Sequence, residues 1–117
     1  ISNEPTEKEL AQVKSLMEQS KVVVLTTCQS EPWTRNLVKE QPKCKESNGS
    51  PAVVVAAREP YDLRHYPDAK AGLATYGYPD ATIQAAADLI FGKIRPLGKL
   101  PVSIPGYAEF GSGLEEL

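Results

Sequence analysis

The stretch TYGYPDATIQAAADLIFGKIRPLGKLPVSIP, residues 75–105, decides the fold of this chain. It predicts the end of one strand, a helix, a tight turn and a last short strand over 100–104. Asp80 is expected to cap the helix, because its carboxylate can accept the free amides of the first turn. Gly92 suits the left-handed residue that ends many helices, and Lys93 would lie beside the negative helix end. A helix between two strands indicates α/β packing.

The same helix is predicted to be amphipathic, with one apolar stripe for the sheet and a polar face for solvent. The stripe consists of Ile83, Ala86, Ala87 and Ile90. Pro101 has no amide to donate, so the strand that follows is expected at a sheet edge.

The first 27 residues predict a helix followed directly by a strand. Thr6 and Glu9 fit a capping box, in which each side chain accepts an amide near the other residue. The buried stripe of this helix is expected to be Leu10, Val13, Leu16 and Met17. The run over 22–25, continuing to Thr27, is apolar on both faces, which is typical of a strand covered by helices on both sides.

Two further strands complete the predicted sheet. AVVVAA, residues 52–57, is a second apolar run, and 71–76 can form a third strand. Both apolar runs are expected to be central strands of a mainly parallel sheet in a three-layer αβα sandwich. Residues 28–51 predict a short crossover helix and a mobile loop. We assign 1–106 to one domain and 107–117 to a surface tail.

Polar and aromatic residues gather where the second and third strands are predicted to end, and ligands usually approach open α/β sheets at that edge. The candidates for a substrate cleft or domain interface are Arg58, Glu59, Tyr61, Asp62, Tyr76 and Tyr78. The alternative is structural: a salt-bridged turn with tyrosines that cover the sheet. No residue is assigned as catalytic.

Composition narrows the classes of partner and site. A net charge of −2 gives no electrostatic reason to expect nucleic acid or an anionic membrane. No apolar run is long enough to cross a bilayer, and no signal-peptide pattern is present. Cys28 and Cys44 are either a disulfide or independent thiols, and with His65 as the only histidine they lack metal-ligand spacing. We therefore expect neither a metal nor a cofactor. The start at Ile1 suggests a processed product or a piece of a longer protein.

Three blocks resemble the carboxyl-terminal domain of glycoside hydrolase family 3. They are VVVAAREPYDL (53–63), ATYGY (74–78) and AADLIFGKIRPLGKLPVSIPG (86–106). Within that family they are most similar to the bacterial two-domain β-N-acetylglucosaminidases, or β-hexosaminidases. The resemblance is weak over 28–51, where the family has a longer helix and a Gly-Lys-Pro turn.

The resemblance implies an accessory domain rather than a complete enzyme. In this family an amino-terminal (β/α)8 barrel carries the carboxylate nucleophile, and these 117 residues contain no such barrel. The domain would pack on that barrel and close one side of the substrate cleft. The implied substrate is β-linked N-acetylglucosamine, and the implied location is extracellular or cell-wall-associated.

Two other functions are compatible with the sequence. One is a free-standing α/β binding or interaction domain that keeps the fold without hydrolase activity. The other is an independent hydrolase, which would need two carboxyl groups about 5–5.5 Å apart if it retained configuration. Glu59 and Asp62 share one loop, which is a poor way to flank a scissile bond from both sides. We therefore expect the chain alone to be inactive.

Overall fold

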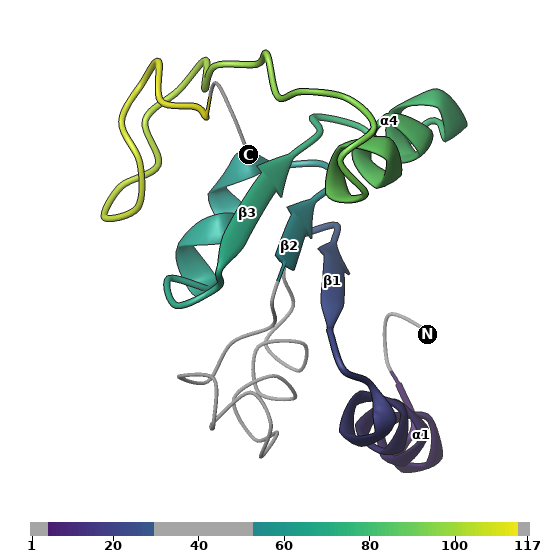
Figure 1. The fold of residues 1–117 in the computed structure, drawn as a ribbon. Helices are drawn as coiled ribbons and strands as arrows, with labels where there is room; N and C mark the ends of the chain where they lie inside the picture. The colour runs from purple at the N-terminus through teal and green to yellow at the C-terminus, as the bar shows by residue number, and fades with distance from the viewer. Residues whose placement is uncertain (1–4, 30–52, 115–117) are drawn as a thin grey trace.

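The computed structural model describes residues 5–29 and 53–114. Along the chain it contains α1 (Glu7–Gln19), β1 (Val24–Thr27), β2 (Val53–Ala56), the 3-10 helix η1 (Pro60–His65), β3 (Ala71–Ala74) and α4 (Asp80–Ile90) (Figure 1). The strands form a parallel sheet in the order β1-β2-β3. The predicted α/β fold with a parallel sheet is confirmed. The helix and loop expected over 28–51 lie mostly outside the residues that the structure describes.

One face of the sheet packs against α1 and η1. The strand register places Leu25, Val54 and Gly72 side by side, so they share a face. A Cβ built on Gly72 would lie 3.2 Å from the Leu63 side chain of η1. Met17 of α1 belongs to the same core cluster as Val54 and Leu63. We call this side of the sheet the η1 face.

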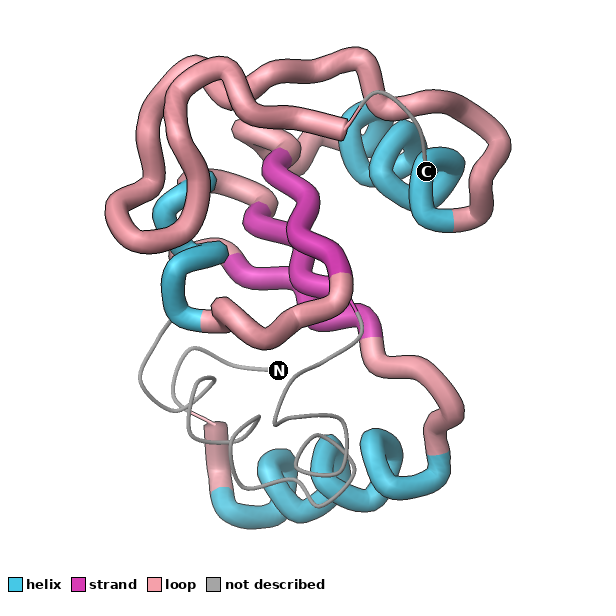
Figure 2. The backbone as a smooth tube through the Cα atoms, turned by 60° about the vertical axis from the view of Figure 1, so that its left-hand side comes forward, coloured by secondary structure: helices cyan, strands magenta, loops and turns pink. Residues whose placement is uncertain are grey.

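The opposite face is partly covered by α4, which lies across the sheet from α1 in two views (Figures 1 and 2). Val55 of β2 points to this face and is buried, as is Ala86 of α4. Helices therefore flank the sheet on both sides.

The helix α1 begins as predicted. The Glu9 amide donates to Thr6 Oγ1 over 3.3 Å, and the Thr6 amide donates to Glu9 Oε2 over 2.8 Å, which completes the capping box. The predicted stripe is too wide, however. Met17 is buried, whereas Leu16 is exposed, because the side of α1 that meets the core carries positions 10, 13 and 17.

The prediction of two central strands is right for β2 and wrong for β1. β2 is buried on both faces, whereas β1 is at the edge of the sheet that residues 5–29 and 53–114 form. The side chains of Val22 and Val24 are 62% and 45% exposed, and Val22 lies before the strand. A run that is apolar at every position is therefore not always buried on both faces of its strand.

The ends of α4 correct one prediction and confirm another. Pro79, not Asp80, is the N-cap residue, and no side chain caps the first turn. Gly92 has a φ of +71°, and its amide donates to Leu89 O, while the Lys93 amide donates to Asp88 O. The positive φ confirms the predicted left-handed residue at the helix end, and the pair of bonds forms a Schellman motif. The predicted stripe is incomplete, since Ile83 is exposed.

No strand forms over 100–104, contrary to prediction. Ile104 makes only an isolated antiparallel bridge with Ala108, and Leu100 exchanges hydrogen bonds with the backbone near 111–112. The prolines at 101 and 105 cannot donate to a ladder, which limits the pairing to this short bridge. Ile104 is nevertheless only 1% exposed and belongs to the core cluster, and Tyr107 packs against that cluster. The domain boundary after 106 stays a prediction.

Candidate functional site

The carboxyl ends of β2 and β3 bring Arg58 and Tyr76 to one edge of the sheet. Ala56 pairs with Ala74 at the last register position of the two strands. Beyond it the Thr75 amide donates to Ala56 O over 3.1 Å, so the two chains stay together past the strand ends. Arg58 and Tyr76 follow within two residues of that bond. The expectation that they share an edge of the sheet agrees with this geometry.

Thr75 fixes the backbone that carries Tyr76. Its Oγ1 lies 2.8 Å from Gly77 O and 3.3 Å from Ala57 O, and its single hydrogen favours the shorter contact. Tyr76 has a φ of +58°, a left-handed conformation that costs a non-glycine residue about 1–2 kcal/mol. The backbone at Tyr76 is thus fixed, and 49% of the residue's surface is exposed.

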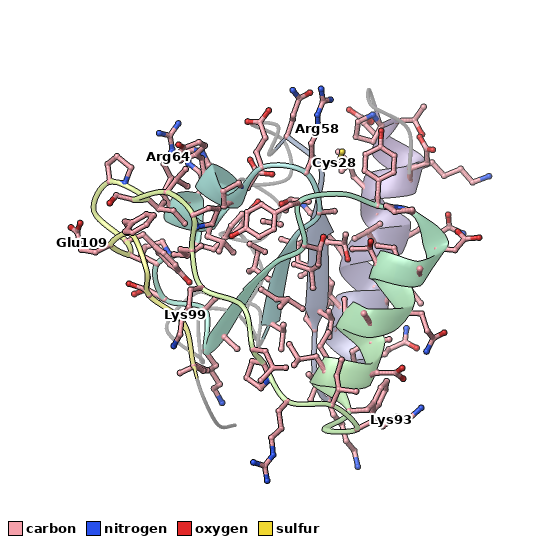
Figure 3. All side chains as sticks on the ribbon, turned by 90° about the horizontal axis from the view of Figure 1, so that it is seen from above. Cys28, Arg58, Arg64, Lys93, Lys99 and Glu109 are labelled. Atoms are coloured by element: carbon pink, nitrogen blue, oxygen red, sulfur yellow. The ribbon has the colours of Figure 1, made fainter. Side chains whose placement is uncertain are left out.

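The remaining candidates divide by exposure. Arg58 and Glu59 are exposed, and Glu59 precedes η1 without capping it. Tyr61 and Tyr78 also expose their rings. We define the carboxyl-edge surface as the five exposed candidates: Arg58, Glu59, Tyr61, Tyr76 and Tyr78. Figure 3 shows Arg58 at the opposite end of the molecule from Lys93.

Asp62, the sixth candidate, is buried and is not part of this surface. It is only 6% exposed, and its backbone amide donates to Glu59 O over 3.2 Å within the first turn of η1. The carboxyl group therefore lies inside the domain. Glu59 and Asp62, the two acids of this loop, consequently face different environments.

The end of β1 brings Cys28, which the sequence indicated only as a thiol or disulfide partner, to the same edge of the sheet. The Ala57 amide donates to Thr27 O over 2.8 Å, which places Cys28 beside the start of the Arg58 loop. Gln29 has a φ of +63° without any glycine to indicate the turn. Cys28 is exposed, and Cys44 lies outside the described residues, so the Cys28–Cys44 disulfide stays a prediction.

The carboxyl-edge surface offers aromatic faces and hydrogen-bond donors. Partial burial raises the pKa of Tyr76, so its hydroxyl remains protonated at neutral pH and can donate. Arg58 adds a planar cation. Such groups suit contact with a protein surface or a sugar. Within residues 5–29 and 53–114, no cluster of His, Cys, Asp and Glu could hold a metal ion.

No helix among the described residues has both the length and the apolar character that a membrane span requires.

Fold and edge together define an α/β domain in which helices flank a three-stranded parallel sheet and aromatic and charged residues are exposed where the strands end. The family model for the glycosyl hydrolase family 3 C-terminal domain matches residues 7–112, nearly the whole chain. The chain therefore belongs to this family of domains, which are normally parts of multidomain enzymes. Neither the curated proteins nor the solved structures gave a match.

Proposed function

We propose that this chain is the accessory carboxyl-terminal domain of a β-N-acetylglucosaminidase-type hydrolase. In this proposal its carboxyl-edge surface packs on the catalytic barrel and borders the substrate cleft. The observation that carries the proposal is the joint exposure of Arg58 and Tyr76 at one sheet edge in a family 3 domain. Arginine and tyrosine are over-represented among the residues that dominate binding energy in protein interfaces. The β-N-acetylglucosaminidase type is supported by the three sequence blocks.

The chain alone is expected not to hydrolyse the glycoside. A glycosidase needs a nucleophile or base, a matched proton donor and a pocket that orients the sugar. Glu59 is exposed and Asp62 is buried, so these two acids are not a matched pair across an open cleft. The catalytic carboxylates would then belong to the barrel.

The first experiment is an assay of the purified chain with a chromogenic N-acetylglucosaminide, beside Glu59→Gln and Asp62→Asn. No turnover is expected. Turnover that Glu59→Gln abolishes while the variant stays folded would overturn the accessory role. Turnover that survives both substitutions would be traced first to a contaminating enzyme by repurification.

The second experiment uses the protein expressed from its complete reading frame. We expect it to carry a barrel and to cleave an N-acetylglucosaminide faster than a glucoside. Arg58→Ala and Tyr76→Ala should each weaken barrel–domain packing by about 1 kcal/mol or more, seen as earlier thermal unfolding of the barrel. Arg95→Ala is the matched control, because Arg95 is exposed in the turn after α4. A reading frame without a barrel would favour a free-standing binding or interaction domain.

A further inference from the structure

Residues 99–113 fold back on themselves beside β3, and we call this segment the strap (Figures 1 and 2). Leu100 joins its two arms, because the Leu100 amide donates to Ser112 O and the Gly111 amide donates to Leu100 O, each over 2.8 Å. Nearer the tip, the Ile104 amide donates over 2.7 Å to a carbonyl of the other arm. Each backbone–backbone hydrogen bond that the described structure gives the strap joins two of its own residues. The backbone pairing of the strap is therefore internal.

Polar side chains close the strap further. At its base, Lys99 Nζ donates to Gly113 O over 3.1 Å. Between the arms, Ser103 Oγ donates to Glu109 Oε2 over 3.2 Å and accepts from the Phe110 amide over 2.9 Å. Both sets of bonds again join residues of the strap to one another. They favour a segment that keeps or loses its structure as a whole.

The contacts of the strap with the sheet are made by apolar side chains. Ile104 belongs to the core cluster, and Leu100 and Tyr107 pack against that cluster. The Tyr107 hydroxyl lies over Gly72 on the η1 face of β3. Segments open locally when few buried apolar contacts attach them and their own hydrogen bonds lie near the surface. The strap has both of these properties.

We infer that the strap opens and closes over the η1 face as one unit while the rest of the domain stays folded. Opening withdraws Ile104 and Tyr107 from the sheet and uncovers Gly72 and the side chain of Leu63. The rival possibility is that the strap is an integral part of the core and leaves it only when the whole domain unfolds. The inference goes beyond the proposed function, because the strap lies outside the carboxyl-edge surface.

Amide hydrogen exchange with residue resolution, measured in the 117-residue chain at increasing urea below the unfolding transition, tests the inference. An isolated two-stranded hairpin is only marginally stable in water, so the strap amides exchange once the strap has left the sheet. We expect Leu100, Ile104 and Gly111 to share one level of protection, at least about tenfold below that of Val55 in the central strand. Their exchange should also depend less on urea, because opening the strap exposes less surface than global unfolding. Protection of Val55 shows that the chain is folded.

Two substitutions separate opening of the strap from global unfolding. Gly72→Ala crowds Tyr107 without changing the strap itself, so exchange at the strap amides should become about fivefold faster or more. Ala86→Gly is the matched control, because Ala86 is buried in α4 on the opposite face of the sheet. It should speed exchange at Val55 by about fivefold or more and leave the strap amides unchanged.

Any of three results would overturn the inference. In the first, the strap amides and Val55 have the same protection and the same urea dependence. In the second, Leu100, Ile104 and Gly111 differ from one another as much as they differ from Val55, so that they do not open together. In the third, Ala86→Gly speeds exchange at the strap amides as much as at Val55, which would make the strap an integral part of the core.

Discussion

The Tyr107 hydroxyl occupies the space that a Cβ would take at Gly72, on the η1 face of β3. The side chain of Leu63 borders the same space. Gly72 thus allows the segment after Ile104 to pack closely against the sheet. This contact connects the segment after Ile104 to the core.

Gly72→Ala should therefore destabilise the domain by overpacking, by about 1–3 kcal/mol in urea unfolding. Gly98→Ala is the control, because its Cβ would meet no atom within 4 Å and its φ is not positive. Tyr107→Phe removes the atom in conflict, so Gly72→Ala should cost less in that background. An equal cost in both backgrounds would show that the tyrosine is not the obstacle.

The pH dependence of stability should report the same tyrosine. Burial raises the pKa of Tyr107 above the ordinary tyrosine value of 10.0, because the charged phenolate is poorly solvated in the fold. The unfolded chain therefore releases this proton first. The stabilising contribution is complete below pH 10 and is lost as pH rises through the raised folded pKa. Urea unfolding between pH 8 and 11 should show a decline that is shallower in Tyr107→Phe; identical slopes would contradict the assignment.

The sequence predicted what depends on local chemistry. Thr6 and Glu9 carry both halves of a capping box. Position 92 has a left-handed backbone that glycine adopts without strain. β2 was predicted because its residues form an apolar run, and three of its four residues are buried. Each of these features is determined by residues close together in the chain.

The errors arose where contacts between residues far apart in the sequence determine which side chains are buried. Val22 and Val24 resemble buried strand residues, but they are 62% and 45% exposed. Ile104 is buried without belonging to a strand. At the candidate site, the sequence predicted that Arg58 and Tyr76 would lie at the same edge, because parallel strand ends meet there. It did not predict the burial of Asp62, which depends on the turn of η1 into the core.

Ile104→Ala should be among the most damaging single changes. The side chain is 1% exposed and lies in the core cluster with Val54 and Leu63, so its truncation leaves a cavity. The expected loss is about 2–5 kcal/mol of unfolding free energy. Leu97→Ala, at an exposed position, should change stability by less than about 0.5 kcal/mol. Similar effects at the two positions would argue against the close packing of the 100–108 segment.

The capping box predicts a smaller and more local effect. Thr6→Ala should cost about 0.5–2 kcal/mol, because the Glu9 amide loses its acceptor. Glu7→Gln is a control in the same turn of α1, and it leaves both capping bonds in place. Circular dichroism during urea unfolding measures both variants. A Thr6→Ala variant as stable as the parent would mean that α1 does not depend on this cap.

Tyr76 allows the strain of its backbone to be separated from the role of its side chain. Glycine adopts a φ of +58° without steric cost, so Tyr76→Gly should offset the loss of ring contacts and leave stability equal or higher by up to about 1 kcal/mol. Tyr78→Gly is the matched control: Tyr78 lacks a positive φ, so this change should cost about 0.5–1 kcal/mol. If the Tyr76 ring contacts the barrel, Tyr76→Gly should stabilise the isolated domain and still weaken its association with the barrel. A variant that loses stability as Tyr78→Gly does would show that ring packing, rather than backbone strain, dominates at position 76. Unchanged barrel association would remove Tyr76 from the proposed interface.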